Sequence, residues 1–266
     1  MRSIYSFAAA TAFGLSLSTA ALAEEPVDPA ADGWTGSIGA GLVMTGGNTE
    51  TESGNAVFDV TRSIGAWSHN LNTSALWTAD SVRTTAEKYY LSFQSNRALS
   101  EKSYLFGIAS YDDDRFSSFD YQASAAIGYG YQVIANDTMN LKLEAGPGYR
   151  ISRPFIYQTD AMGMNVVDAN TGLPIKTGVG PKDNELIGRF AESFDWQFSD
   201  NAKLIQELNV EAGSDNTVTR FLVAVETNVV GAIALRVSYG IKNNTDVAPG
   251  LDKTDTETAI TLAYGF

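Results

Sequence analysis

The chain has 266 residues, a formal net charge of −13 at pH 7 and no cysteine. So acidic a chain is a poor candidate for nucleic-acid binding, which relies on clustered Lys and Arg side chains. The lack of cysteine excludes disulfides and thiolate metal sites. No motif in the sequence indicates a cofactor.

The first 23 residues have the features of a secretory signal peptide. Arg2 supplies a positive charge, residues 7–17 are largely apolar, and small residues precede Glu24. Such a segment is removed on export and takes no part in the mature fold. A buried N-terminal helix is the weaker alternative, because an acidic run follows so abruptly. The sequence therefore predicts the following organisation: a signal peptide at 1–23, a short linker at 24–32 and a single β-barrel domain at 33–266.

Apolar and polar residues alternate with a period of two through the rest of the chain, which is typical of strands with two different faces. The clearest case is residues 117–133, where Tyr129, Tyr131 and Val133 alternate with Gly130 and Gln132. About twelve such segments are expected, in chain order: 33–45, 51–64, 67–79, 84–98, 103–113, 117–134, 138–154, 184–199, 202–212, 217–230, 232–243 and 254–266.

These segments fit a membrane barrel better than a soluble β-sandwich. Many have roughly 10 to 15 residues, whereas soluble strands average about five or six and transmembrane barrel strands need about 9 to 11. Tight connections alternate with longer ones, as periplasmic turns and outer loops do in such barrels. The sequence predicts an all-β fold, a closed antiparallel transmembrane β-barrel of about 12 strands in a bacterial outer membrane.

Two strands of the predicted barrel have an irregular pattern. Glu192 interrupts the apolar face that Phe190 and Phe194 define, and Ile205 interrupts the alternation of its own strand. The register of these two strands is therefore weakly fixed by the sequence.

The last residues share one apolar face, formed by Leu262, Tyr264 and Phe266. This pattern resembles the C-terminal signal by which the barrel-assembly machinery recognises outer-membrane proteins. The expected partners are therefore this machinery, outer-membrane lipid and lipopolysaccharide.

Several short segments also resemble one particular family. They are 33–36 (GWTG), 45–50 (TGGNTE), 111–116 (YDDDRF), 128–131 (GYGY), 143–150 (LEAGPGYR), 253–258 (KTDTET) and 262–266 (LAYGF). Together they resemble the domain-of-unknown-function family of salt-induced outer-membrane proteins. The resemblance implies a barrel fold, an outer-membrane location and a role under salt or envelope stress. It supplies no activity and no catalytic residues, and the loop at 155–183 looks longer than the family leads us to expect.

Few residues are candidates for catalysis or metal binding. The only histidine, His69, is expected near the periplasmic end, where a structural role is favoured over a nucleophile–histidine pair. Asp112, Asp113 and Asp114 could hold Ca²⁺ or Mg²⁺ through their oxygen atoms, but their spacing does not fit an EF-hand, and a solvated acidic loop is favoured. The sequence therefore predicts neither a catalytic residue nor a metal site, with these aspartates as a weak metal candidate.

Charged residues on the polar faces are expected to point into the lumen. They are Asp59, Lys142, Glu144, Arg150, Arg189, Asp195, Arg220, Glu226, Arg236, Lys242 and Glu257. They either pair as a plug that fills the barrel or line a narrow aqueous path, since twelve strands lie between filled eight-stranded barrels and open sixteen-stranded porins. The favoured hypothesis is a structural, envelope-stress barrel with at most a narrow passive conduit for small solutes. An outer-membrane hydrolase with an unrecognised active site is the alternative.

Overall fold

The computed structural model describes residues 33–45, 51–80, 84–169 and 173–266. The expected signal peptide and linker, 1–23 and 24–32, lie outside these residues. The strands of the described part are β1 (Gly33–Thr45), β2 (Thr51–Ile64), β3 (Trp67–Asp80), β4 (Thr84–Ala98), β5 (Ser103–Asp114), β6 (Phe119–Ala135), β7 (Met139–Tyr157), β8 (Lys176–Val179), β9 (Asp183–Ser199), β10 (Ala202–Gly213), β11 (Thr217–Val230), β12 (Ile233–Asn244) and β13 (Thr254–Gly265). The described residues contain no helix long and apolar enough to cross a membrane.

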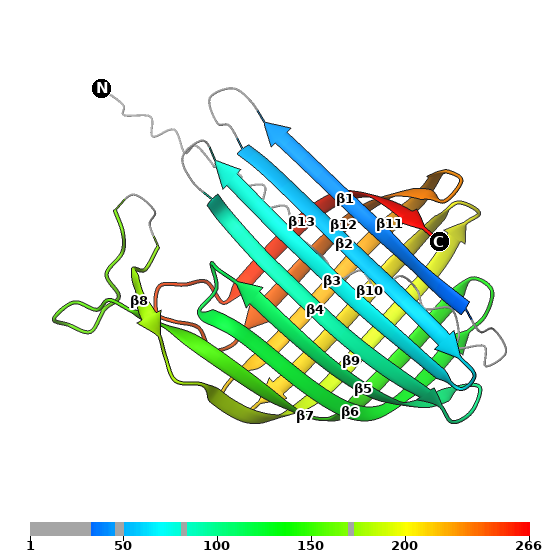
Figure 1. Ribbon diagram of the computed structural model, residues 1–266, viewed down its shortest axis with the longest axis horizontal. Coiled ribbons are helices and arrows are strands. Elements are labelled where there is room, and N and C mark those ends of the chain that lie inside the picture. The colour runs from blue at the N-terminus through cyan, green and yellow to red at the C-terminus, as the bar shows by residue number, and fades with distance from the viewer. Residues whose placement is uncertain (1–32, 46–50, 81–83, 170–172) are drawn as a thin grey trace, which may run out of the picture.

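All these strands except β8 form one closed ring (Figure 1). Consecutive strands of the ring pair antiparallel, and the ring closes where β1 pairs with β13, for example Ser37 with Gly265 and Ala40 with Leu262. This pairing covers residues 37–40 of β1 and 262–265 of β13, and it joins the two edges of the sheet there. The predicted all-β, closed antiparallel barrel of 12 strands is confirmed. The extra strand, β8, pairs with the end of β7 and was not predicted.

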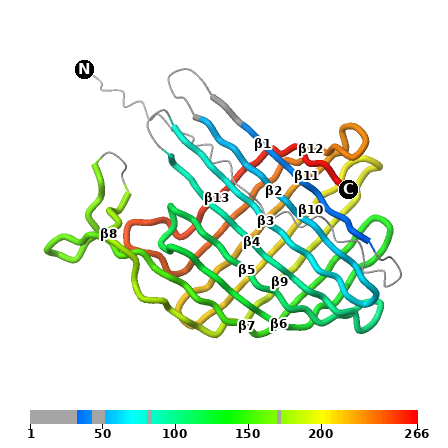
Figure 2. Tube along the Cα trace, viewed as in Figure 1, coloured from blue at the N-terminus to red at the C-terminus, as the bar shows by residue number. Residues whose placement is uncertain are grey.

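The two ends of the barrel differ in their connections. At the turn end, Gly65 and Gly231 form tight turns with φ of +55° and +57°, a left-handed conformation that favours glycine. At the loop end, the β7–β9 connection carries β8 and projects beyond the barrel (Figure 2). There the Asn165 amide donates to the Pro249 carbonyl oxygen at 2.6 Å, and the Ala248 N–H donates to Ser118 Oγ at 2.9 Å. These bonds link the β12–β13 connection to the β7–β9 connection and to the β5–β6 connection.

The faces of the barrel are the reverse of those of a soluble protein. Large apolar side chains cover the exterior; Ile127 is 68% exposed and Leu186 79% exposed. The interior contains polar and charged side chains, among them Asp59 at 2% and Arg150 at 1% exposure. The period-two alternation in the sequence therefore separates an apolar exterior from a polar lumen.

One inward patch on β5 is aromatic. Tyr104 and Phe106 are buried inside the barrel against β6, where Gly128 and Gly130 make room for their rings. A Cβ on Gly128 would lie 2.7 Å from two ring carbons of Phe106 and 2.2 Å from the Ala145 carbonyl oxygen. Glycine at this position is therefore a packing requirement of the barrel wall.

We expect Gly128→Ala to lower the free energy of unfolding by about 1–3 kcal/mol, because the added methyl group overpacks against backbone as well as a side chain. Gly188→Ala is the matched control, since a Cβ there would have nothing within 4 Å. Denaturant unfolding of both variants in lipid vesicles measures the difference. Equal stability of the two variants would contradict the packing role of Gly128.

Candidate functional site in the barrel lumen

The structure places the expected lumen charges on the inward side of the barrel wall. They are Asp59, Lys142, Glu144, Arg150, Arg189, Asp195, Arg220, Glu226, Arg236, Lys242 and Glu257. Many of them form ion pairs with one another or with inward charges that the sequence analysis did not select. Most of the pairs gather in four groups along the lumen.

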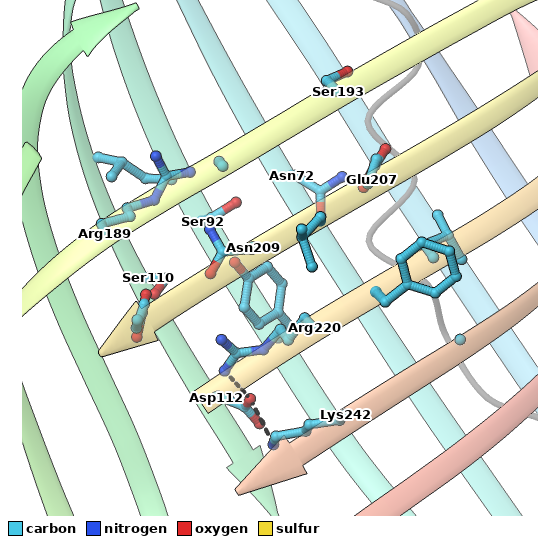
Figure 3. Close-up of a pocket in the computed structure, with 18 of the residues that line it drawn as sticks. Asn72, Ser92, Ser110, Asp112, Arg189, Ser193, Glu207, Asn209, Arg220 and Lys242 are labelled. Atoms are coloured by element: carbon cyan, nitrogen blue, oxygen red, sulfur yellow. Dashed lines mark hydrogen bonds and ion pairs between the residues drawn. The ribbon is translucent and has the colours of Figure 1, made fainter. Parts of the chain in front are cut away.

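The first group crosses the lumen from one wall to the other. Asp112 Oδ2 on β5 accepts hydrogen bonds from Arg220 Nη2 on β11 and from Lys242 Nζ on β12, both at 2.8 Å (Figure 3). In the strand order of the ring, β5 lies opposite β11 and β12. We call Asp112, Arg220 and Lys242 the cross-lumen bridge. It narrows the lumen near the loop end.

The other two aspartates of the acidic run point elsewhere. Asp114 also faces inward and pairs with Lys88 at 3.2 Å. Asp113 lies on the outer face, opposite the exposed Tyr89. The run therefore does not converge on one point, and the described residues contain no group of three or more potential metal ligands.

Arg150 is the centre of the second group, which lies near the loop end; its side chain is 1% exposed. Its guanidinium donates to Glu185 Oε1 at 2.5 Å and lies 3.5 Å from Glu211 Oε2. It also donates to the backbone carbonyl oxygens of Glu211, at 3.3 Å, and of Asn216. Arg150 thus joins β7, β9, β10 and the β10–β11 connection through charge-assisted hydrogen bonds.

Glu144 and Glu226 form the centres of the other two groups. Glu144 accepts from Arg189 Nη1 at 2.7 Å, Gln94 Nε2 at 2.7 Å and the Tyr104 hydroxyl at 3.0 Å. Glu226, nearer the turn end, accepts from Arg236 Nε at 2.8 Å and pairs with Lys203 at 3.1 Å. Each of these two carboxylates thus has a cationic partner, which offsets the cost of burying its charge.

Solvent-sized space remains between these groups. A cavity of about 280 Å³ lies inside the barrel and is lined by residues of both charge signs, including Arg189, Glu207 and Lys242 (Figure 3). A second cavity, of about 430 Å³, lies at the turn end beside Asp59 and Glu226. The lumen is therefore partly filled rather than solid, and it can hold water, ions or a small polar solute.

His69 lies outside the lumen. It is on the exterior of β3, stacked between Trp67 and Phe93 with ring centroids 6.0 Å and 6.1 Å apart. The chain has no other histidine. No lumen serine or threonine can therefore use a histidine as its general base.

Several inward charges were not predicted from the sequence, among them Lys88, Asp112, Glu185 and Glu211. Glu185 and Glu211 could have been predicted from the alternation of their strands. Glu185 lies on the same face of β9 as Arg189, and Glu211 lies on the same face of β10 as Lys203. Asp112 was harder to place. On β5, Tyr104, Phe106 and Ile108 face inward, so both faces of the strand are apolar and the alternation is obscured.

We expect Arg150→Met to lower the free energy of unfolding by about 3–5 kcal/mol, because it leaves two buried carboxylates without their partner. Arg153→Met is the matched control on the same strand. Arg153 is 37% exposed and lies 3.9 Å from Asp120, so its loss should cost less than about 1 kcal/mol. Denaturant unfolding in vesicles measures both values. A similar small cost for the two variants would show that the Arg150 group does not stabilise the barrel.

Comparison with known proteins gives one family and several structures of similar shape. The chain is 26% identical over 235 residues to the uncharacterized protein YdiY of Escherichia coli strain K12, covering 86% of this chain and 82% of that protein. The translocator domain of the autotransporter NalP from Neisseria meningitidis is 11% identical, with a TM-score of 0.47 and 88% of each chain covered. The outer-membrane channel DcaP of Acinetobacter baumannii is 10% identical, with a TM-score of 0.38 and coverage of 88% of this chain and 96% of the channel.

The family of proteins of unknown function DUF481 matches residues 38–266, which is nearly the whole barrel. The resemblance found in the short sequence segments is thus confirmed across the domain. The chain belongs to the DUF481 family.

Proposed function

We propose that this protein is an exported outer-membrane barrel with a structural role in the envelope, whose lumen is a narrow passive conduit for small ions and polar solutes. The observation that carries the proposal is the cross-lumen bridge together with the cavity beside it. The bridge restricts the lumen, and the cavity leaves a polar space lined by both charge signs.

The exterior supports the membrane location. Contiguous apolar surface of this extent is rare on a soluble protein but is the lipid-facing band of a membrane barrel. Near the turn end, Arg62 lies 5.3 Å from the Trp34 ring centroid and Arg97 lies 5.7 Å from that of Trp67. Aromatic and basic side chains of this kind anchor a barrel at the membrane–water interface.

The ion pairs support a narrow conduit over a wide pore. Charges in the four groups are held by partners 2.5–3.5 Å away, so they do not project freely into a wide channel. Paired charges of both signs make a weakly selective, restricted path. Small hydrated ions fit such a path, whereas larger solutes meet the bridge.

An enzymatic function has less support. A hydrolase of the serine–histidine type needs a histidine beside its nucleophile. His69 lies on the exterior among aromatic rings, away from both cavities. We therefore propose a non-enzymatic barrel.

The salt-stress role follows from the resemblance of the sequence segments. We expect the amount of this protein in outer-membrane fractions to rise when the cells are grown at raised NaCl, relative to an unrelated barrel of the same membrane. Quantitative mass spectrometry of the fractions measures this. A constant amount across salt concentrations would end this part of the proposal and leave the conduit unaffected.

The conduit is tested by planar-bilayer recording. We expect small, stable conductance steps from the wild type. Asp112→Ala should give larger steps, because the bridge is lost, and a reversal potential shifted toward anion selectivity, because Arg220 and Lys242 lose their counter-charge. Asp113→Ala removes a neighbouring carboxylate from the outer face and should behave as the wild type.

Silent bilayers with wild-type protein whose insertion is verified would end the conduit hypothesis. Equal effects of the Asp112 and Asp113 substitutions would end the role of the cross-lumen bridge.

A further inference from the structure

One carboxylate, that of Glu192, lies on the outer face of the barrel among mainly apolar side chains. Glu192 on β9 lies on the same face of its strand as the outward residues Phe190 and Phe194, which flank it. Its register partners on the neighbouring strands are Leu143 on β7 and Leu208 on β10. The interruption of the apolar pattern in the sequence is therefore real, and the register around it is regular.

Glu192 is accompanied by one polar neighbour. Gln206 on β10 also faces outward, opposite Phe194 on one side and Val223 on the other. Its Nε2 donates to Glu192 Oε2 at 2.9 Å. This bond uses one of the two amide N–H groups of Gln206 and one of the two carboxylate oxygens of Glu192. We call these two residues the exterior polar pair.

The position of Glu192 differs from that of the exterior arginines Arg62 and Arg97. Arg62 and Arg97 lie near the turn end, over the rings of Trp34 and Trp67, where headgroups and water are close. Within the described residues, Glu192 is the exterior carboxylate that apolar side chains flank on all four sides. If this carboxylate faced lipid, it would lose its water while one of its oxygens lacked a hydrogen-bond donor. Burying a polar group in this way costs free energy.

We infer that the exterior polar pair is the centre of a homodimer interface, in which β9 and β10 of two copies face each other. The inference rests on the membrane location in the proposed function. All copies of a barrel insert in one orientation, so the two-fold axis of a dimer lies along the membrane normal and equivalent residues meet at the same depth. A second copy that packs through its own β9 and β10 therefore presents its polar pair opposite this one, at the same depth.

The chemistry of the pair is self-complementary about that axis. The second N–H of Gln206 in one copy can donate to the free oxygen of Glu192 in the other, and the reciprocal bond forms by symmetry. Such hydrogen bonds across an apolar surface favour association of membrane proteins. The surrounding leucine and phenylalanine side chains provide the packing surface.

Cysteine cross-linking tests the interface directly, because the chain contains no cysteine. Leu208→Cys places a thiol beside the pair, and Leu71→Cys places one on the exterior of β3, on the opposite wall. In reconstituted vesicles at low protein density, a short thiol cross-linker should join two copies of the Leu208 variant and leave the Leu71 variant monomeric. Equal cross-linking of the two variants, or none in the Leu208 variant, would overturn the inference.

Variants of the pair separate its role from that of the apolar surface. In mild detergent, mass measurement by light scattering should give a dimer for the wild type and a monomer for the double variant Glu192→Leu, Gln206→Leu. This variant should fold well, because it only makes a lipid-facing surface more apolar. The exchanged variant Glu192→Gln, Gln206→Glu keeps the same donors and acceptors and should remain dimeric.

Insertion is verified first by the heat-dependent mobility of each variant on gels and by co-flotation with vesicles. A wild type that inserts as a monomer, or a leucine double variant that stays dimeric, overturns the homodimer alone. A wild type that does not insert overturns the proposed membrane location. Cross-linking of the Leu208 variant in whole cells to a protein of a different mass also overturns the homodimer, because it identifies another partner for this face.

Discussion

The structure depends on the antiparallel hydrogen bonds between β1 and β13 that close the sheet into a ring. In a bilayer, every backbone N–H and C=O group in the hydrocarbon region must find a partner within the protein, and a closed barrel meets this requirement with strands alone. Closure also separates the two faces of every strand. Because side chains alternate along a strand, one face of each strand belongs to the exterior and the other to the lumen, and the chemistry of the protein follows from that division.

The sequence was sufficient to predict the barrel because apolar and polar residues alternate along nearly every strand. The alternation of Tyr129 and Tyr131 with Gly128 and Gly130 gives β6 its faces without any knowledge of its neighbours. The lumen partners were not predictable in this way. Asp112 meets Arg220 and Lys242 across the barrel, more than a hundred positions away in the chain, and no local pattern encodes which inward charges face each other.

Two features of the sequence gained their meaning only from the three-dimensional arrangement. In the sequence, Glu192 interrupts the apolar pattern of β9, whereas the structure gives it a regular position on the exterior beside Gln206. The acidic run at 112–114 suggested one site, whereas its first and third carboxylates pair with different cations inside the barrel and its second faces outward. In both cases the residue type was informative, but the sequence did not show which residue would be its partner.

The central claim is that the apolar face of each strand meets lipid and the polar face meets water. Single cysteines at consecutive positions 122–127 of β6, in protein reconstituted into vesicles, test it most directly. We expect a water-soluble maleimide to label positions 122, 124 and 126, and a bilayer-embedded quencher to reach fluorophores at 123, 125 and 127. Labelling by the water-soluble reagent at all six positions, with no period of two, would contradict the account.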